Sequence, residues 1–447
     1  MSVVRILQPL SVASWAALGL VLALLAAPPA SADPPGVTER VSVGPAGAAG
    51  DNDSQLAAIS GNGRYVAFVS SASTLVADDT NGTSDVFVHD RSTGLTERVS
   101  VDSRERQSAD AEAGGVLDTN FGRPAITPDG RYVAFASTAT NLVKGDRNDA
   151  VDIFLRDRVA GTTERVTAVG RKLVANAESS NPAISPDGRF VAFQSFADNL
   201  VPGDTNFTSD VFVVDRQAGT VVRASVTSTG EQASNSSGSP AISADGRLVA
   251  FESSAPLVAG EPDDFANDIY LRDVQAGTTV GIGTSGSESV GHSGAPTITP
   301  DGRFVAFQSW DDSLVAGDDN NSYDVFVFDR ATGALERVSV STAGVQGNDW
   351  SQAPAISDDG RFVAFQSFAD NLVAGDTNFD YDVFVRDRQA ATTVRASVRT
   401  DGSEGGLSLA SFLPTMSADG TVVAFTSEAD LVPQDSGFPL DVYVHDH

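Results

Sequence analysis

The chain has 447 residues, with 29 Lys and Arg against 59 Asp and Glu, so its formal net charge is −30. Such an acidic protein is disfavoured as a partner of nucleic acids and anionic membranes, which are themselves negatively charged. No cysteine occurs, which excludes disulfides, cysteine-linked lipids and thiol catalysis.

Residues 1–32 have the organisation of a secretory signal peptide. Arg5 precedes an apolar run from Trp15 to Ala27, and Ala30-Ser31-Ala32 follows as a cleavage pattern. The alternative is an uncleaved membrane anchor, for which the apolar run is short. We therefore expect a secreted, periplasmic or other extracytoplasmic protein that begins near Asp33 and has no membrane span after cleavage.

The remainder, residues 33–447, consists of near-copies of one unit, best seen in residues 183–226. Self-similarity of this kind is typical of repeat architectures and must be found before any fold is assigned. Seven copies align on the Phe of a Val-Ala-Phe triplet, and these anchors are Phe68, Phe135, Phe193, Phe251, Phe307, Phe365 and Phe425.

Each copy predicts four short strands joined by turns. In the third copy the strands are residues 183–185, 189–195, 210–215 and 221–226, with Pro-Asp-Gly and Gln-Ala-Gly at two of the turns. The second and third strands are continuous apolar runs, so both of their faces should be buried. Seven such antiparallel sheets predict a single all-β domain, a seven-bladed β-propeller. The Ala before each anchor Phe would let neighbouring sheets approach closely.

The two ends of the chain predict how the ring closes. Residues 38–43 match the fourth strand of the other copies, but no first three strands precede them. The seventh copy stops at residues 441–447 and lacks a fourth strand. The N-terminal strand should therefore complete the last blade and remove two open sheet edges. The connection over residues 101–124 is about nine residues longer than its equivalents and should protrude.

Strand parity sorts the loops onto two faces. The first–second and third–fourth turns are short and share one face, the short-turn face. The second–third loops and the blade-to-blade connections are long and rich in Asp, Asn, Ser and Gly, and they share the other, the long-loop face. Because binding residues concentrate on loops held by a rigid scaffold, we expect function on the long-loop face.

Five second–third loops carry the motif Asp-x-Asn-x-x-x-Asp. Oxygen ligands at positions 1, 3 and 7 resemble the first half of calcium loops, although the Gly at position 6 and the bidentate Glu at position 12 of an EF-hand are absent. The alternative is that these residues form Asx turns and bond the backbone. The fourth copy carries Glu261, Asp263, Asp264 and Asp268 instead. Calcium is the one cofactor that the sequence suggests, with Asp79, Asn81, Asp85, Asp146, Asn148, Asp152, Asp204, Asn206, Asp210, Asp318, Asn320, Asp324, Asp376, Asn378 and Asp382 as candidate ligands.

Catalytic signatures are scarce, and no catalytic residue is predicted. His89 and His445 share a repeat position that also holds Arg, Val and Phe, which predicts a surface site at a strand end. His447 is terminal, which leaves His292 as the histidine expected in a long-loop connection. No nucleophile elbow, zinc-protease motif or phosphate-binding loop occurs. Carboxylates are plentiful, but the sequence does not pair two of them as acid and base.

The Ser-Pro-Asp-Gly turn before an apolar strand resembles the repeat of the TolB-like, or WD-like, β-propeller family. Residues 185–188 match this turn fully, and residues 127–130 and 299–302 match with Thr for Ser. The resemblance covers about residues 38–447 and implies the propeller fold, in a family that includes scaffolds, receptor-like modules and non-catalytic domains of peptidases. This chain departs from TolB itself in having seven repeats and no N-terminal α/β domain. It also lacks an appended hydrolase domain.

These patterns favour an exported, monomeric binding or scaffold module that takes a protein, peptide or glycan on its long-loop face without catalysis. One alternative is a propeller enzyme, a carbohydrate-active or other hydrolase or lyase, with its site in the central funnel of that face. Another is a purely structural repeat protein. A surface that includes Trp310 and Trp350 would favour binding, although Trp310 beside a second strand looks more like packing. A cluster of His292 with Arg, Glu and a metal would favour an enzyme.

Overall fold

The computed structural model describes residues 36–108, 122–169, 173–261, 266–283, 292–406, 409–433 and 439–447. Residues Pro35–His447 form one compact unit. The predicted signal peptide and most of the long connection before Pro124 lie outside the described residues. In the part of the chain that is described, no helix has the length and apolar character needed to cross a membrane.

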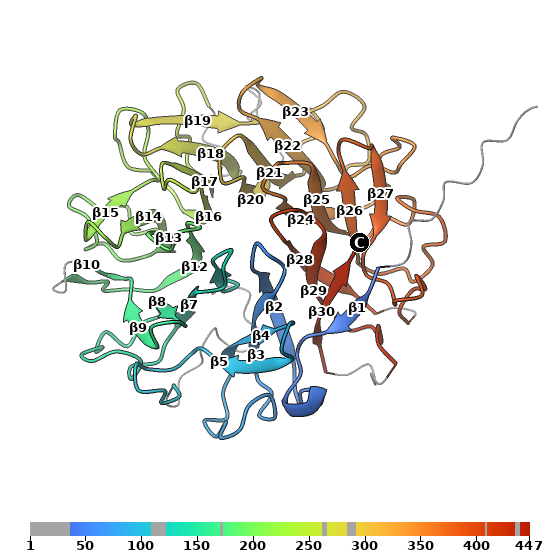
Figure 1. The fold of residues 1–447 in the computed structure, drawn as a ribbon. Helices are drawn as coiled ribbons and strands as arrows, with labels where there is room; N and C mark the ends of the chain where they lie inside the picture. Colours follow the sequence, from blue (N-terminus) through green and yellow to red (C-terminus); the bar gives the residue numbers. More distant parts are fainter. Residues whose placement is uncertain are drawn as a thin grey trace, which may run out of the picture. The chain divides into compact units, whose positions relative to one another are not determined.

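Seven four-stranded antiparallel sheets form the blades of a propeller, as predicted, with the first strand of each blade innermost (Figure 1). A short hairpin, β10 (Ala168–Val169) with β11 (Leu173–Val174), and a 3-10 turn, η1 (Pro45–Gly47), lie between blades. In chain order, blades 1 to 7 are β2–β5 (Ser54–Ile59, Tyr65–Ser70, Asp85–Asp90, Leu95–Arg98), β6–β9 (Ala125–Ile126, Tyr132–Ser137, Asp152–Asp157, Thr162–Arg165), β12–β15 (Ser179–Ile184, Phe190–Ser195, Asp210–Asp215, Thr220–Arg223), β16–β19 (Ser237–Ile242, Leu248–Ser253, Asp268–Asp273, Thr278–Ile282), β20–β23 (Ser293–Ile298, Phe304–Ser309, Asp324–Asp329, Ala334–Arg337), β24–β27 (Ser351–Ile356, Phe362–Ser367, Asp382–Asp387, Thr392–Arg395), and β28–β30 with β1 (Ser411–Met416, Val422–Ser427, Asp441–Asp446, Thr38–Arg40).

The ring closes through the N-terminal strand, which confirms the prediction made from the two chain ends. Strand β1 pairs antiparallel with β30, with Thr38 opposite His445 and Arg40 opposite Tyr443. The Oγ1 of Thr38 also lies 2.8 Å from Nδ1 of His445. Every blade therefore has four strands, and β30 presents no unpaired edge.

The core lies between the blades and is built by the predicted anchors. Each anchor Phe is at most 1% exposed, and the Ala before it is fully buried. Each anchor ring packs on an aromatic ring of the third strand of its own blade, with ring centroids 5.8–6.1 Å apart. This stacking adds to the hydrophobic stabilisation that burial of the rings provides.

The first strand of the unit is longer than predicted. In blade 3 it runs over Ser179–Ile184, whereas the sequence predicts only residues 183–185. Its register shifts at a bulge, where Asn181 has a φ of 51° before Pro182, so the usual alternation is interrupted. The fourth strand ends at Arg223, because the backbone then leaves the ladder and Ala224 donates to the Val211 carbonyl.

The surface location predicted for His89 and His445 is wrong. His89 and His445 are both buried, with 5% and 4% of their surface exposed. The repeat position points into the space beneath the preceding connection, where His89 contacts Thr96 Oγ1 at 2.9 Å. In other blades a buried arginine fills the same space, as Arg156 does in blade 2. The position tolerates several residue types because the packing around it differs between blades.

Candidate binding site on the long-loop face

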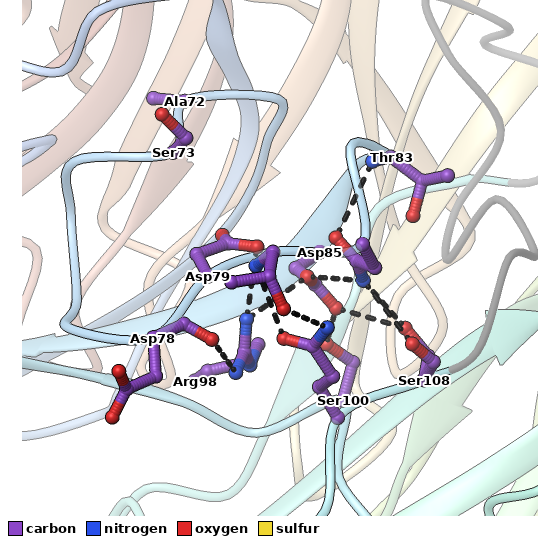
Figure 2. Close-up of polar contacts among 12 residues, drawn as sticks. Ala72, Ser73, Asp78, Asp79, Thr83, Asp85, Arg98, Ser100 and Ser108 are labelled. Atoms are coloured by element: carbon purple, nitrogen blue, oxygen red, sulfur yellow. Dashed lines mark hydrogen bonds and ion pairs between the residues drawn. The ribbon is translucent and has the colours of Figure 1, made fainter.

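The second–third loop of blade 1 folds around Arg98, at the end of β5 (Figure 2). The Nη1 of Arg98 lies 3.0 Å from Oδ1 of Asp79 and 3.4 Å from Oδ2 of Asp85. Asn81 donates to Oδ2 of Asp85 at 2.9 Å, and the Ser100 hydroxyl donates to its other oxygen. The three residues of the motif are therefore brought together, and they surround an arginine.

The same arrangement recurs in the four other blades that carry the motif, with Nη1 of the arginine 2.6–3.5 Å from both carboxylates. In each, the Asn donates to the second Asp. These sets are Arg165 with Asp146, Asn148 and Asp152; Arg223 with Asp204, Asn206 and Asp210; Arg337 with Asp318, Asn320 and Asp324; and Arg395 with Asp376, Asn378 and Asp382.

Burial dominates the electrostatics of these sets. It raises the pKa of Asp324 to about 7 and that of Asp376 to about 6, against the lowering effect of the adjacent arginine. The pKa values of Asp79, Asp146 and Asp204 are raised for the same reason. A calcium ion would have to share the carboxylates with the guanidinium or replace it, and calcium at these loops stays a prediction.

The loop motif alone does not reveal the arginine, but the fourth strand carries a signal. Each blade with the motif has Arg, then Val or Ala, then Ser or Thr, where its fourth strand ends. Blade 4 has Gly281 and Gly283 at the equivalent positions, and its loop is rearranged around Glu261 and Asp268. Blade 7, where Gly437 replaces the Asn of the motif, keeps the arginine, because Nη1 of Arg40 lies 3.1 Å from Oδ2 of Asp441. The arginine is therefore absent only from the blade whose loop is rearranged.

The most exposed aromatic side chains of the described chain all lie on the long-loop face. Their exposure ranges from 39% to 86%, and no other Phe, Tyr or Trp among the described residues is exposed to this degree. Three follow directly after a second strand, one precedes a first strand, and two lie in second–third loops. We call this set the aromatic sector, and it comprises Phe196 and Phe207 of blade 3, Trp310 of blade 5, and Trp350, Phe368 and Phe379 of blade 6.

Within this sector, Tyr323 lies between the two tryptophans. Its ring centroid is 5.5 Å from that of Trp310 and 6.4 Å from that of Trp350, the latter in an edge-on contact. Phe368 makes a similar edge-on contact with Tyr381 at 5.3 Å. Trp310 is 42% exposed, so the expectation that it is packing filler is wrong. The tryptophans belong to a surface cluster that bridges blades 5 and 6.

Two members of the sector have an unusual backbone conformation. Phe207 and Phe379 have φ values of 58° and 57°, in the left-handed region. Blade 1 has Gly82 at the equivalent position, with a φ of 69°. A bulky residue in this region is a genuine outlier that costs of order 1–3 kcal/mol. These side chains are 86% and 74% exposed, so packing does not offset that cost.

The second strands of blades 3 to 6 each carry a polar side chain, one residue before the strand ends at the long-loop face. Gln194, Gln308 and Gln366 each accept, through Oε1, a hydrogen bond of 2.8–3.1 Å from a backbone N–H of the next blade's first strand. Glu252 does the same in blade 4, where Ala295 donates at 3.2 Å. Burial raises the pKa of this Glu252 carboxyl, and burial together with Glu252 raises that of Tyr323.

The residues that would form an enzyme site do not converge. His292 accepts a 3.3 Å hydrogen bond from the Asn267 backbone through Nδ1. Arg123 precedes β6 and donates to the Pro414 carbonyl at 3.0 Å, and burial lowers its pKa to about 10. In the described part of the chain, no hydrogen bond or ion pair joins His292, Arg123 or Glu252 to one another.

The comparisons with known proteins find the fold and no family. No family model matches the chain, and no curated protein matches it. Among solved structures, the β-propeller domain of the Trilobed protease from Pyrococcus furiosus has a TM-score of 0.53 at 12% identity, over 89% of this chain and 94% of that one. An oligogalacturonate lyase from Vibrio parahaemolyticus has a TM-score of 0.51 at 13% identity, over 88% and 90%.

TolB, the protein whose repeat the sequence resembles, is also among the structures found. TolB from Acinetobacter baumannii has a TM-score of 0.40 at 16% identity, over 81% of this chain and 76% of that one. That score is too low to carry an argument. The likenesses above 0.5 show that this chain is a β-propeller, and they assign it no ligand or reaction.

Proposed function

We propose that the protein is an exported, monomeric binding module whose ligand, a protein, peptide or glycan, contacts the aromatic sector without catalysis. The observation that carries this proposal is that the six exposed aromatic side chains among the described residues are confined to the long-loop face of blades 3, 5 and 6. Grouped exposed apolar residues on a rigid scaffold are typical of binding surfaces. Export is supported by the signal-peptide pattern of residues 1–32.

The energetics of the sector support the same proposal. Exposed Trp and Phe side chains contribute little to folding, whereas burial of such rings against a partner dominates many interfaces. The left-handed Phe207 and Phe379 lower the stability of the folded chain. Residues that oppose stability and project into solvent are explained by a ligand that buries them.

Tryptophan fluorescence offers a direct test. Of the three tryptophans, Trp310 and Trp350 lie in the sector, and Trp15 belongs to the predicted signal peptide. In the mature protein, a ligand at the sector should therefore shift or quench nearly all of the emission. Phe196→Ala with Phe368→Ala should weaken that response, and Val159→Ala, which removes an exposed side chain of the short-turn face, should not. Ligands whose affinity is unaffected by the double variant would contradict the proposal.

A second candidate function, a propeller enzyme, is favoured by Glu252. This half-buried carboxyl has a raised pKa and lies near Tyr323 at the aromatic sector, as a general acid would. Glu252→Gln keeps the acceptor for the Ala295 N–H but cannot donate a titratable proton. If the protein is an enzyme, this variant should lose turnover while still binding. If it is a binding module, Glu252→Gln should leave ligand affinity nearly unchanged.

Calcium binding is a further proposal, and blade 6 is the loop best suited to it. There Glu404 joins Asp376 and Asp382, so that one ligand oxygen from each lies within 4.8 Å of the others around a single arginine. The equivalent residues in blades 1, 3 and 5 are Gln107, Gln232 and Gln346. If calcium binds, millimolar calcium should raise the melting temperature relative to chelator, and Glu404→Gln should reduce that rise. Equal melting temperatures in both solutions would exclude the ion.

A further inference from the structure

We propose that the aromatic sector and the glutamines beneath it form repeated subsites for a neutral glycan. This inference rests on the proposed binding function and names the chemical class of its ligand. The subsites follow a short sequence pattern, Phe-Gln-Ser followed by Phe or Trp, which occurs in blades 3, 5 and 6 as residues 193–196, 307–310 and 365–368. Blades 1, 2, 4 and 7 lack it.

The pattern places an amide and an aromatic ring on the same side of each blade. Side chains two residues apart in an extended chain point to one face, about 7 Å apart. Gln194 and Phe196, Gln308 and Trp310, and Gln366 and Phe368 are therefore paired, with the ring at the long-loop end of the strand. At the same position, blades 1, 2 and 7 carry Val69, Ala136 and Thr426, which are buried.

Each glutamine keeps a hydrogen-bond donor for a ligand. Its Oε1 is occupied by a backbone N–H of the next blade, at a residue with a φ of 50–55° in the first-strand bulge. That bond fixes the orientation of the amide. The Nε2 of Gln194, Gln308 and Gln366 has no acceptor in the described part of the chain, and all three residues are half-buried rather than enclosed.

An oriented amide donor beside an exposed ring suits a sugar. The ring offers an apolar face with negative quadrupole, which attracts the C–H face of a pyranose, and the amide donates to a hydroxyl oxygen. Three equivalent subsites on one face of the ring, two on adjacent blades 5 and 6 and one on blade 3 beyond blade 4, suit a chain of repeated sugar units, since linked weak contacts add in avidity.

The charge of the surrounding surface favours a neutral sugar over an acidic one. Asp311, Asp349 and Asp380 directly follow or precede residues of the aromatic clusters. The arginines that end the fourth strands of blades 3, 5 and 6, Arg223, Arg337 and Arg395, are each held by at least two carboxylates. Arg399, in the connection after blade 6, donates to the carbonyls of Asp430 and Glu404. A uronate polymer would therefore meet net repulsion from the surrounding carboxylates.

The test uses fluorescence titration of the mature protein with neutral hexasaccharides of glucose, mannose and xylose. Hexagalacturonate, a chitosan hexamer and a decapeptide of Lys and Arg serve as charged comparisons. We expect saturable quenching by at least one neutral hexasaccharide and at least about tenfold weaker binding of hexagalacturonate.

The decisive variants are Gln308→Glu and Gln366→Glu. Each keeps the acceptor for the neighbouring N–H and replaces the free donor by an acceptor, and blade 4 carries Glu252 in the same structural role. We expect each variant to bind the neutral glycan about five- to tenfold more weakly, as loss of one hydrogen bond implies, with an unchanged melting temperature. Unchanged affinity in both variants would overturn the subsite assignment.

The outcomes also separate this inference from the binding function itself. If only the basic peptide or the chitosan binds, and Phe196→Ala with Phe368→Ala abolishes that binding, the sector is a binding site and the neutral-glycan assignment is wrong. If neutral hexasaccharides bind equally well to the aromatic double variant, the sector is not their site, and both proposals fail. Absence of any response to the neutral hexasaccharides at millimolar concentration overturns the glycan assignment alone.

Discussion

Both faces of the propeller carry Arg–Asp ion pairs, but the pairs are exposed on one face and buried on the other. On the short-turn face, six arginines at 38–48% side-chain exposure pair with aspartates at 12–15% exposure. On the long-loop face, six arginines of the described chain at 6–12% exposure pair with aspartates at 0–5%. The chemical partners are identical, and only their access to water differs.

The carboxyl pKa values show what this difference does. On the short-turn face, hydrogen bonds from arginine lower the pKa of Asp157, Asp215 and Asp329 to about 2. On the long-loop face, burial outweighs the arginine and raises the pKa of Asp324 to about 7. A salt bridge therefore does not by itself reveal whether it stabilises the fold, because desolvation can exceed the attraction. The long-loop face carries both this cost and the strained, exposed aromatics.

Among the changes predicted here, removal of a buried arginine should reduce the free energy of unfolding the most. Arg337→Met would leave the Asp318 and Asp324 carboxylates facing each other without a cation, and we expect a loss of about 3–5 kcal/mol in the free energy of unfolding at pH 8. The loss should be smaller at pH 5, where the carboxyls with raised pKa values accept protons. Urea unfolding at both pH values measures this, and an equal loss at both would show that Arg337 acts through packing alone.

The second largest effect should be the change with pH in the free energy of unfolding of the unmodified protein. The folded pKa of Asp324, about 7, exceeds its ordinary value of 3.8, so its contribution is present at low pH and is lost as pH rises through about 7. Burial lowers the pKa of His89 and lowers that of His445 to about 4, so these two histidines act in the opposite sense and add stability as pH rises through about 6.5. The Asp324 contribution should therefore fall with a slope of about 1.4 kcal/mol per pH unit between about pH 4.5 and 6.5 and level off above pH 7. Asp324→Asn should remove this contribution, which is measured as the difference in pH dependence between the variant and the unmodified protein in thermal unfolding, and identical pH dependence of the two would assign the effect to other groups.

Relief of backbone strain should have a smaller effect on the free energy of unfolding, and it should stabilise the protein. Phe207→Gly or Phe379→Gly should stabilise the protein by about 1 kcal/mol, because glycine adopts a positive φ freely and blade 1 already has Gly82 there. The same variants should weaken ligand binding at the aromatic sector. Denaturant unfolding and fluorescence titration together measure the trade-off. Destabilisation by both variants would show that these rings support the fold.

The smallest effect should come from the short-turn face of the same blade. Arg303→Met removes an arginine whose side chain is 48% exposed and pairs with Asp329. Exposed ion pairs contribute little to stability and are screened by salt, so we expect the smallest change in the free energy of unfolding of this series, reduced further at high salt. This variant is the matched control for Arg337→Met. Equal losses from the two substitutions would remove the distinction between the faces.

Much of the fold could be predicted because the same pattern of strands and turns recurs in every copy of the repeat. The Val-Ala-Phe anchors, the turn residues and the unmatched strands at the two ends predict seven blades and their closure by residues 38–43. The strand bulge could not be predicted, since Ser239, Ala353 and Leu413, the equivalents of Asn181, adopt a positive φ that is supported by a hydrogen bond to a glutamine of the preceding blade. That support depends on a contact between sheets.

Less of the candidate site could be predicted, for the same physical reason. The long-loop face and the convergence of Asp79 and Asp85 follow from local spacing. The arginine between them comes from another strand of the blade, and the pairing of Trp310 with Trp350 joins two blades. His89 and His445 are buried by connections that their own strands do not contain.

The sequence by itself determined the number of blades, the anchors of the core, the strand that closes the ring and the face that carries the long loops. Each of these depends on periodicity, turn chemistry or the count of strands, which are properties of neighbouring residues. Only the tertiary structure decided which carboxylates are buried, which arginine each one meets, and which aromatic rings gather at the surface. Burial and pKa depend on how sheets stack in space, and residues that are distant along the chain set both.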